Sequence, residues 1–254
     1  MGKVAVKSDR EIALMRESGR IVADVLSLVG KSIRPGVTTR ELDELAEEFI
    51  RAQGAVPAFK GYGHDRHNLY PATLCVSIDD EVVHGIPGPR RLEEGQIVAI
   101  DVGVKKNGWF GDAARSFAVG RVSEEKERLL HVTREALEKG LAQARTGAHL
   151  HDVSSAVQEH VEAAGFSVVR DLVGHGIGRN LHEDPPVPNF GTAGTGPVLR
   201  EGMALAVEPM VNAGTYRVTV DADGWTVRTA DGRPSAHFEH TVIVRADGAE
   251  IMTR

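Results

Sequence analysis

Four acidic residues lie within or beside apolar stretches of the sequence, where an ionised side chain is costly. Asp101 interrupts an apolar run, and Asp112 follows it across the turn-like segment 105–108. Glu208 and Glu239 repeat this arrangement later in the chain. A carboxylate inside an apolar strand costs several kcal/mol unless it is paired or bound to a metal. Taken singly, each of the four also fits a turn carboxylate or a salt-bridged strand residue.

Together, the four carboxylates indicate bound cations. If two halves of the chain pack about a twofold axis, Asp101 and Asp112 face Glu208 and Glu239. Four like charges within a few ångströms require a cation. Two divalent ions would balance the four negative charges and leave room for a bound hydroxide. This charge balance is what a two-metal hydrolase needs.

Histidines can complete such a ligand set. His175 is the best placed, because the glycines on both sides of it let the backbone turn sharply there. His84 and His182 lie in similar loop settings. For each of these three, a hydrogen-bonded structural histidine is the alternative. His237 and His240 lie beside Glu239. They either hydrogen-bond a metal ligand without touching the metal, or their side chains point away from the site on the other face of the strand.

The elements that position these residues begin with two helix pairs. Capping boxes and apolar residues at steps of three and four predict the first pair at 8–30 and 38–54, joined by the turn Pro35-Gly36. The second pair is expected at 123–141 and 146–165, and it also ends at a glycine. The sequence therefore predicts helix, turn, helix twice.

The sequence also repeats itself at long range. The second helix of one pair aligns with that of the other without a gap, so that Gly36 matches Gly147 and Gly54 matches Gly165. A Glu-Gly turn leads into a short apolar strand twice, at 96–102 and 203–208. Chance matches among common helix residues are the alternative. We predict an α+β fold in one catalytic domain, 1–254, with pseudo-symmetric halves at about 8–120 and 121–250.

Composition and charge exclude several classes of protein. The chain has 254 residues, of which 41% are hydrophobic and 26% charged, so it can bury a sizeable core. Its net charge of -6 disfavours charge-driven binding to nucleic acid or acidic membranes. The sequence begins without an apolar signal segment, and no run approaches a membrane span. Because the single cysteine, Cys75, also excludes an internal disulfide, we expect a cytoplasmic protein.

At these residues the sequence strongly resembles one enzyme family over nearly its whole length. The shared motifs are Cys75-Val76-Ser77 with Val83-His84-Gly85-Ile86-Pro87, Ile100-Asp101-Val102 with Gly111-Asp112, Gly174-His175-Gly176-Ile177-Gly178-Arg179 with His182-Glu183, Val207-Glu208-Pro209-Met210-Val211-Asn212-Ala213-Gly214, and Ser235-Ala236-His237-Phe238-Glu239-His240-Thr241. In this order and spacing they resemble the methionine aminopeptidases, specifically the short type I form without an N-terminal extension. Type II enzymes carry an inserted helical segment between the positions that match His175 and Glu208, and the short interval between these two residues here favours type I.

The resemblance implies a fold and a metal site. The fold is the "pita-bread" fold, in which helices of two pseudo-symmetric halves back a curved antiparallel sheet. The implied metal ligands are Asp101, Asp112, His175, Glu208 and Glu239. By family analogy, Asp112 and Glu239 bridge two divalent ions, Asp101 chelates one of them, and His175 and Glu208 hold the other. Ligands of these types suit Mn, Fe or Co, while Zn follows from the affinity order and Mg from the oxygen-rich ligation.

The resemblance also implies a mechanism. A hydroxide between the ions attacks the carbonyl after the first residue, and Glu208 passes its proton to the departing amine. His182 hydrogen-bonds the carbonyl oxygen or the intermediate, and His84 contacts the scissile or leaving nitrogen. The substrates are nascent proteins, met at the ribosome, that carry an initiator methionine before a small second residue. We expect a monomer that binds neither nucleic acid nor membranes.

An apolar pocket for methionine is implied at Tyr70, Cys75, Leu181 and Trp225, with Tyr62 beside it. Aromatic surfaces and sulfur suit a thioether side chain, whereas core packing is the alternative for the larger members. Two departures from the family concern this pocket. The stretch 61–70 is longer than in many bacterial relatives, and Leu181 replaces a frequent aromatic residue, so the pocket is expected to be reshaped.

Two other functions compete with this interpretation. An Xaa-Pro peptidase uses the same five ligand types, but such proteins usually carry a further N-terminal domain, and the short stretch before Cys75 is already used by the first helix pair. A binding protein that kept the fold and lost catalysis typically loses ligands, whereas all five ligand types are present in this chain. Both alternatives are less consistent with the sequence than a methionine aminopeptidase.

Overall fold

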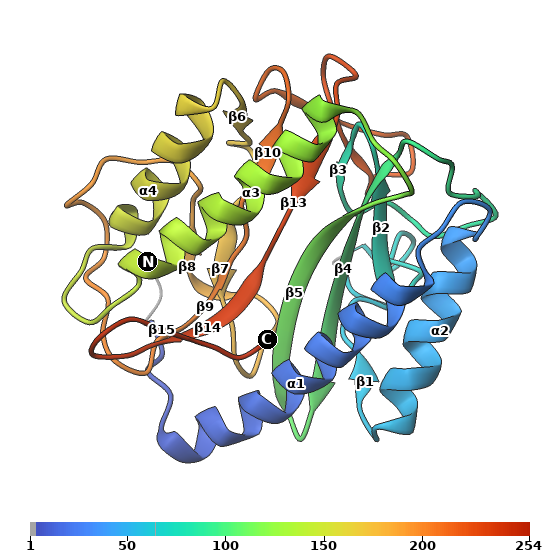
Figure 1. Cartoon of the computed structure of the whole chain (residues 1–254). Helices are drawn as coiled ribbons and strands as arrows, with labels where there is room; N and C mark the ends of the chain where they lie inside the picture. Colours follow the sequence, from blue (N-terminus) through green and yellow to red (C-terminus); the bar gives the residue numbers. More distant parts are fainter. Residues whose placement is uncertain (1–3, 64) are drawn as a thin grey trace.

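The computed structural model describes residues 4–63 and 65–254. These residues form four α-helices: α1 (Asp9–Ser32), α2 (Thr39–Ala52), α3 (Glu124–Gln143) and α4 (Leu150–Ala163) (Figure 1). The two predicted helix pairs are therefore confirmed to within a few residues at each end. No helix in the described ranges is both long enough and apolar enough to cross a membrane.

Hydrogen bonds at the helix starts explain where the first pair begins. The backbone N–H of Glu41 donates to Thr38 Oγ1 at 3.1 Å, and the Glu41 carboxylate accepts from the N–H of Thr38 at 2.7 Å. The Glu11 carboxylate accepts from the N–H of Ser8 in the same way, at 3.0 Å. These reciprocal contacts satisfy backbone donors that have no partner inside the helix.

Fifteen strands accompany the helices in the described part of the chain. Those before α3 are β1 (Val56–Pro57), β2 (Leu74–Ile78), β3 (Glu81–Val83), β4 (Ile97–Lys106) and β5 (Trp109–Ala118). Those after α4 are β6 (Ser167–Val168), β7 (Gly174–Gly176), β8 (Glu183–Val187), β9 (Ala204–Val207), β10 (Met210–Asn212), β11 (Val218–Val220), β12 (Val227–Thr229), β13 (Ser235–His237), β14 (His240–Val244) and β15 (Ala249–Ile251).

The strands form four antiparallel sheets. The first half of the chain contributes β1-β4-β2, with β5 paired to β4, and the second half contributes the five-stranded order β15-β14-β9-β7-β8. Two smaller sheets have the orders β13-β10-β6 and β11-β12-β3. The last of these joins β3 of the first half to β12 of the second. Helices and antiparallel strands grouped in this way confirm the predicted α+β class.

The β4-β5 hairpin brings two of the acidic residues onto one face. Asn107 and Gly108 at its tip have φ angles of 52° and 81°, the left-handed pair that a two-residue hairpin turn requires. Asp101 pairs with Ala114, and Asp112 pairs with Gly103 two positions along. The two carboxylates are therefore diagonal neighbours on the same face of the hairpin.

Helices cover the face of the strands that is turned away from these carboxylates. α1 packs on β4 and β5, and α3 packs on β10 and β13, so the two long helices cross the same side of the strands (Figure 1). Gly111 permits the close approach of α1, because a Cβ atom there would lie 2.9 Å from the backbone nitrogen of Gly19. A helix pair followed by antiparallel strands occurs in each half. The pseudo-twofold relation between the halves stays a prediction.

Candidate metal centre

The five predicted metal ligands come from five separate positions in the strands. Asp101 lies on β4, Asp112 on β5 and His175 on β7, whereas Glu208 directly follows β9 and Glu239 lies between β13 and β14. All five line one cavity of about 120 Å³. Both halves of the chain therefore contribute carboxylates to the same small space.

The ligand atoms lie close enough to surround a cation. His175 Nε2 is 3.6 Å from Glu208 Oε1 and 3.9 Å from Asp112 Oδ2. Asp112, His175 and Glu239 each offer one ligand atom, and these three atoms lie within 4.8 Å of one another. Ligand atoms about 2.0–2.2 Å from a shared ion are separated by distances of this order.

The hydrogen bonding of the carboxylates leaves atoms without partners. Asp101 Oδ1, Asp112 Oδ1 and Glu239 Oε1 are buried and find no hydrogen-bond partner among the described residues. Buried polar atoms are almost always satisfied, so three such oxygens in one cavity call for a group that protein atoms do not supply. Four carboxylates and one imidazole form a donor set that suits a divalent metal ion.

The raised pKa values of the four carboxyl groups also indicate a bound cation. Burial raises the pKa of Asp112 to about 7. Burial also raises the pKa of Glu208 and Glu239 well above the usual range, and the charge of Asp112 adds to that effect. The pKa of Asp101 is raised by burial and by the charges of Asp112 and Glu208. Without a cation these carboxylates repel one another, and a divalent ion removes that repulsion.

His175 is oriented to act as a ligand. Its Nδ1 lies 2.8 Å from the carbonyl oxygen of Gly176, so Nδ1–H donates to that oxygen and the Nε2 lone pair faces the carboxylates. Burial lowers the pKa of His175 to about 3, which keeps the ring neutral. A neutral imidazole with a free Nε2 is the form that binds metals.

The predicted reason for the glycines around His175 is wrong. They do not form a sharp turn, because Gly174–Gly176 is strand β7 inside the five-stranded sheet. A Cβ atom on Gly174 would lie 2.4 Å from the carbonyl oxygen of Ala206, and one on Gly176 would lie 2.2 Å from that of Asp184. The glycines instead let neighbouring backbone approach the ligand strand.

His182 and His84 also line the cavity. The ring of His182 is tilted against that of His175, with 4.2 Å between the two centroids, and its Nδ1 lies 2.6 Å from the hydroxyl of Tyr62. The ring of His84 lies edge-on to that of Trp225, at 6.4 Å. Burial lowers the pKa of His182, and it lowers that of His84 to about 4, so both rings are neutral.

The other end of the cavity is apolar. Tyr62, Tyr70, Cys75, Leu181 and Trp225, the five residues predicted for a side-chain pocket, all line it. The rings of Tyr70 and Trp225 meet edge-on at 5.2 Å, and Cys75 is the cross-strand partner of Asp101. The apolar pocket therefore adjoins the acidic cluster directly.

Two residues of this region were missed or left open by sequence reasoning. Phe59 lines the apolar end, and nothing in its sequence spacing indicates this. His237 is buried, with Nε2 3.7 Å from Glu208 Oε2, and neither ring nitrogen has a hydrogen-bond partner in the described part of the chain. His237 therefore points inward, whereas His240 contacts Thr253 Oγ1 at 2.8 Å instead.

Comparison with known proteins defines the class to which this architecture belongs. The model of metallopeptidase family M24 matches residues 13–246, and the chain belongs to this family. Its helices backing curved antiparallel sheets are the pita-bread fold, as predicted. A metallopeptidase also requires the kind of ligand set described above.

Within that family the chain falls among the methionine aminopeptidases. It is 53% identical to the methionine aminopeptidase of Clostridium perfringens over 251 residues, which cover 98% of both chains. It is 50% identical to methionine aminopeptidase 1 of Bacillus subtilis, over 99% of both. The crystal structure of the methionine aminopeptidase of Thermotoga maritima superimposes with a TM-score of 0.96 at 48% identity, covering 99% of each chain. These matches, over nearly the full length of each relative, confirm the predicted resemblance to the methionine aminopeptidases.

Xaa-Pro peptidases share the fold alone. The prolidase of Pyrococcus furiosus superimposes with a TM-score of 0.78 at 22% identity, and the match covers 99% of this chain but 66% of the prolidase. At this identity the match shows a shared fold and no more, whereas the matches at 48–53% identity are to methionine aminopeptidases.

Proposed function

We propose that this enzyme removes the initiator methionine from nascent proteins whose second residue is small, using two divalent ions. The observation that carries the proposal is the direct contact between an acidic cluster with unsatisfied buried oxygens and an apolar pocket sized for one side chain. The cavity of about 120 Å³ is far below the roughly 300–1,000 Å³ of sites for drug-sized ligands. A cavity of this size suits one side chain of a substrate.

The proposed ligands divide between the two ions as in the family. Asp112 and Glu239 would bridge the ions, Asp101 would hold one of them, and His175 and Glu208 the other. The unpartnered oxygens of Asp101, Asp112 and Glu239 support their role as metal ligands, and the division between the two ions rests on the family analogy. When bound, the ions would supply a hydroxide nucleophile at neutral pH and polarise the scissile carbonyl.

The side chains around the ions would transfer a proton and stabilise the charge on the reacting groups. Glu208 accepts a proton and passes it to the departing amine, and its position in the same cavity as the other proposed ligands supports that role. The Tyr62 hydroxyl lies 2.6 Å from His182 Nδ1, and we propose that it donates to that nitrogen. The His182 proton then lies on Nε2, where it can donate to the carbonyl oxygen. His84 contacts the scissile or leaving nitrogen.

The apolar end of the cavity would select methionine. A thioether packs favourably on aromatic rings and near sulfur, and the pocket offers Tyr70, Trp225 and Cys75. Leu181, which is buried, shapes one wall in place of the aromatic residue of many relatives. Because leucine differs in shape from an aromatic ring, we expect tolerance of residues other than methionine to change, which parallel kinetics on methionine and norleucine substrates would test.

The cellular location of the reaction and the oligomeric state of the enzyme are further parts of the proposal. We propose that nascent chains at the ribosome are the substrates, in the cytoplasm, and that the enzyme works as a monomer without binding nucleic acid or membranes. Sucrose-gradient cosedimentation with ribosomes and light scattering of the purified protein test the ribosome contact and the monomeric state.

Release of free methionine from Met-Ala-Ser tests the proposal. Chelator-stripped protein is assayed before and after addition of Mn²⁺ or Co²⁺, with Ala-Pro-Ala alongside. Cleavage of Met-Ala-Ser alone, dependent on metal and saturating at two ions per chain, is the expected result. Saturation at one ion would remove the two-metal assignment, and cleavage of the proline peptide would move the substrate assignment to the Xaa-Pro class.

A further inference from the structure

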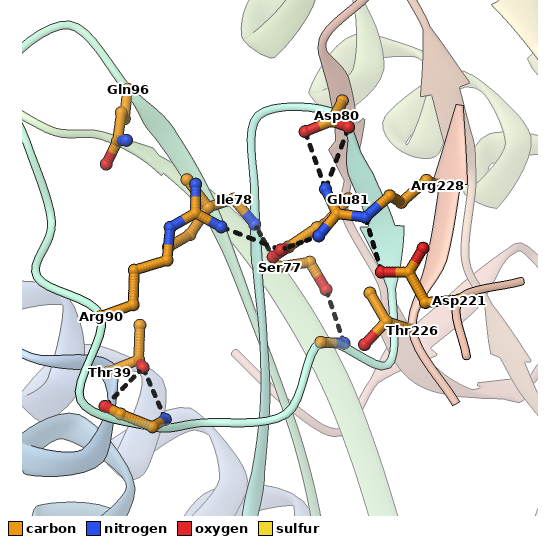
Figure 2. A network of polar contacts seen from close by, with 12 residues as sticks. Thr39, Ser77, Ile78, Asp80, Glu81, Arg90, Gln96, Asp221, Thr226 and Arg228 are labelled. Carbon is orange, nitrogen blue, oxygen red and sulfur yellow. Dashed lines mark hydrogen bonds and ion pairs between the residues drawn. The ribbon is translucent and has the colours of Figure 1, made fainter. Parts of the chain in front are cut away.

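A charged cluster joins β3 to β12 (Figure 2). Arg228, on β12, is its centre and donates to three carboxylates. Its Nε bonds Asp221 Oδ2 at 2.7 Å, its Nη1 bonds both oxygens of Asp80 at 3.0 Å, and its Nη2 bonds Glu81 Oε1 at 2.8 Å. One guanidinium therefore binds residues on both sides of the β3-β12 pair.

Glu81 is the buried member of this cluster, with 8% of its surface exposed. Its Oε2 accepts from the N–H of Ile78 at 2.7 Å, and its Oε1 accepts a second guanidinium bond from Arg90 Nη1 at 2.9 Å. Figure 2 shows Arg90 and Arg228 on opposite sides of the Glu81 carboxylate. Of these two arginines, Arg228 is the one that ties Glu81 to β12, because Arg90 follows β3 on the same segment of the chain.

Both strands of this pair lead into the cavity of the metal centre. β3 ends at Val83, and the next residue, His84, lines the cavity. β12 begins at Val227, two residues after Trp225, which lines the same cavity. The register pairs Val227 with Val83 and Arg228 with Glu81, with an irregularity between them. The Arg228–Glu81 contact thus lies in the same strand pair that leads into both cavity residues, His84 and Trp225.

His84 has a backbone conformation that needs such support. Its φ angle is 61°, in the left-handed region that residues other than glycine rarely occupy. A strained conformation of this kind persists only where the surrounding structure holds it, and it is common at functional sites. The strain at His84 therefore raises the question of what holds the chain on each side of it.

On the side after His84, the chain is held by β2. The N–H of Gly85 donates to Ser77 Oγ at 3.1 Å, and its carbonyl oxygen accepts from the N–H of Val76 at 2.8 Å. A Cβ atom on Gly85 would lie 2.3 Å from the carbonyl oxygen of Val76, so the contact is tight. On the side before His84, the support is the β3-β12 pair with its guanidinium contact.

We propose that Arg228 is a positioning residue that holds His84 in its left-handed conformation beside the metal centre. This inference rests on the role proposed for His84 in contacting the scissile or leaving nitrogen. A planar guanidinium can bind three carboxylates at fixed angles, whereas a lysine ammonium is a point charge without that fork. Arg228 therefore sets the register of β3 against β12 and, through it, the direction of the His84 ring.

The test uses Arg228→Gln and Arg228→Lys in the metal-loaded enzyme, with Arg90→Gln as the matched control. Arg90→Gln also removes a guanidinium from Glu81 but leaves the bridge to β12. Because misplacement of a reacting group by an ångström is costly, we expect Arg228→Gln to lower kcat/KM for Met-Ala-Ser about tenfold, and Arg90→Gln less than about twofold. Arg228→Lys is expected to restore little, since it keeps the charge and loses the fork.

Two readouts separate positioning from general stability. The first is a double-mutant cycle: in a His84→Ala background, Arg228→Gln should cause no further loss of kcat/KM. The second is the NMR signal of the ¹⁵N-labelled His84 ring, measured with diamagnetic Zn²⁺ in place of Mn²⁺, which should move in both Arg228 variants and stay in place in Arg90→Gln. Mn²⁺ affinity should be unchanged, because Arg228 lies outside the predicted ligand set.

The outcomes are distinguishable. An equal loss of kcat/KM in both backgrounds, or an unmoved His84 signal in folded Arg228→Lys, would overturn the proposal. If His84→Ala alone leaves kcat/KM unchanged, the role proposed for His84 fails. The NMR signal then decides about Arg228 by itself: displacement supports the positioning role and an unmoved signal refutes it. If Arg228→Gln does not fold, the kcat/KM and the His84 signal of Arg228→Lys are compared with those of Arg90→Gln instead.

Discussion

The hydroxyl of Thr241 forms hydrogen bonds with both backbone polar groups of Asp112. It accepts from the N–H of Asp112 at 3.0 Å and donates to its carbonyl oxygen at 2.7 Å. The side chain is fully buried and lies two residues after Glu239. A single hydroxyl therefore fastens the strand of one proposed bridging carboxylate to the strand that follows the other.

A second hydroxyl does the same on the other side of Glu239. Ser116 Oγ donates to the carbonyl oxygen of His237 at 2.9 Å and accepts from its N–H at 2.9 Å. Between the two hydroxyls, the N–H of Glu239 donates to the carbonyl oxygen of Ala114 at 2.9 Å. The two side chains thus set the spacing between β5 and the chain around Glu239.

Replacing Thr241 by valine should weaken metal binding and stability together. Valine keeps the shape of threonine but leaves the buried N–H and carbonyl of Asp112 without partners, which costs about 1–3 kcal/mol of the free energy of unfolding. Titration calorimetry with Mn²⁺ and urea unfolding check both effects. Thr241→Ser, which keeps the hydroxyl, is the control, and a Thr241→Val protein matching wild type in both measurements would contradict the role of this hydroxyl.

Removing one ligand charge should have opposite effects on activity and on metal-free stability. We expect Asp101→Asn to lower Mn²⁺-dependent activity at least about 100-fold, because even indirect supports of metal ligands are worth 10–100-fold. The metal-free protein should become more stable, since one of four buried, mutually repelling carboxylates is gone. Activity assays with Mn²⁺ measure the expected loss, and thermal unfolding in chelator measures the expected gain in metal-free stability. Asp24→Asn on the exposed side of α1 is the control, and a destabilised metal-free Asp101→Asn would count against the repulsion.

The metal-free enzyme should lose stability as the pH rises from about 6.5 to about 8. The carboxyl groups of the cluster have raised pKa values when folded, about 7 for Asp112, against about 4 when unfolded. Their stabilising effect is full below the unfolded value and is lost as the pH rises through the folded one. The buried histidines, with folded values such as about 3 for His175, act in the opposite direction but below about pH 6.5.

Thermal unfolding at several pH values, in chelator and with saturating Mn²⁺, checks this behaviour. The bound ion compensates the carboxylate charges, so the melting temperature of the loaded enzyme should not fall over this range. The gap between the loaded and metal-free melting temperatures should widen with pH. Parallel curves for the two forms would show that the cluster does not titrate in this window.

Tyr62→Phe should lower kcat without lowering metal affinity. In the proposed arrangement the Tyr62 hydroxyl, 2.6 Å from His182 Nδ1, donates to that nitrogen and favours the tautomer that carries a proton on Nε2. Without it, a fraction of the enzyme holds the other tautomer, so we expect a loss in kcat of about tenfold, smaller than the roughly 100–1,000-fold loss on removing a donor altogether. Steady-state kinetics and Mn²⁺ titration are the measurements. Tyr216→Phe, at an exposed tyrosine, controls for the loss of a hydroxyl, and unchanged kcat in Tyr62→Phe would show that the tautomer is set by other contacts.

The features that could be read from the sequence are encoded over short distances. Capping boxes and apolar periodicity placed all four helices, and Asn107-Gly108 placed the β4-β5 hairpin, because each depends on neighbouring residues. Asp101 and Asp112 stood out because a charge inside an apolar run is costly wherever it occurs. The family motifs then located twelve of the thirteen residues that line the cavity.

Other features depended on strands that meet only after folding. Phe59 and the inward direction of His237 are visible only once the two halves close around the cavity. The glycines beside His175 do not form a turn. They lack a Cβ atom, which lets the backbone of β8 and β9 pack closely against β7.

The helices, the hairpin and the unusual acidic and histidine residues could be predicted because local chemistry specifies them. The groups that hold those residues in place became visible only in the folded structure. Thr241 meets Asp112 across 129 residues, and Arg228 meets Glu81 across 147. Contacts over such separations depend on how whole strands pack, and no pattern of neighbouring residues encodes that packing.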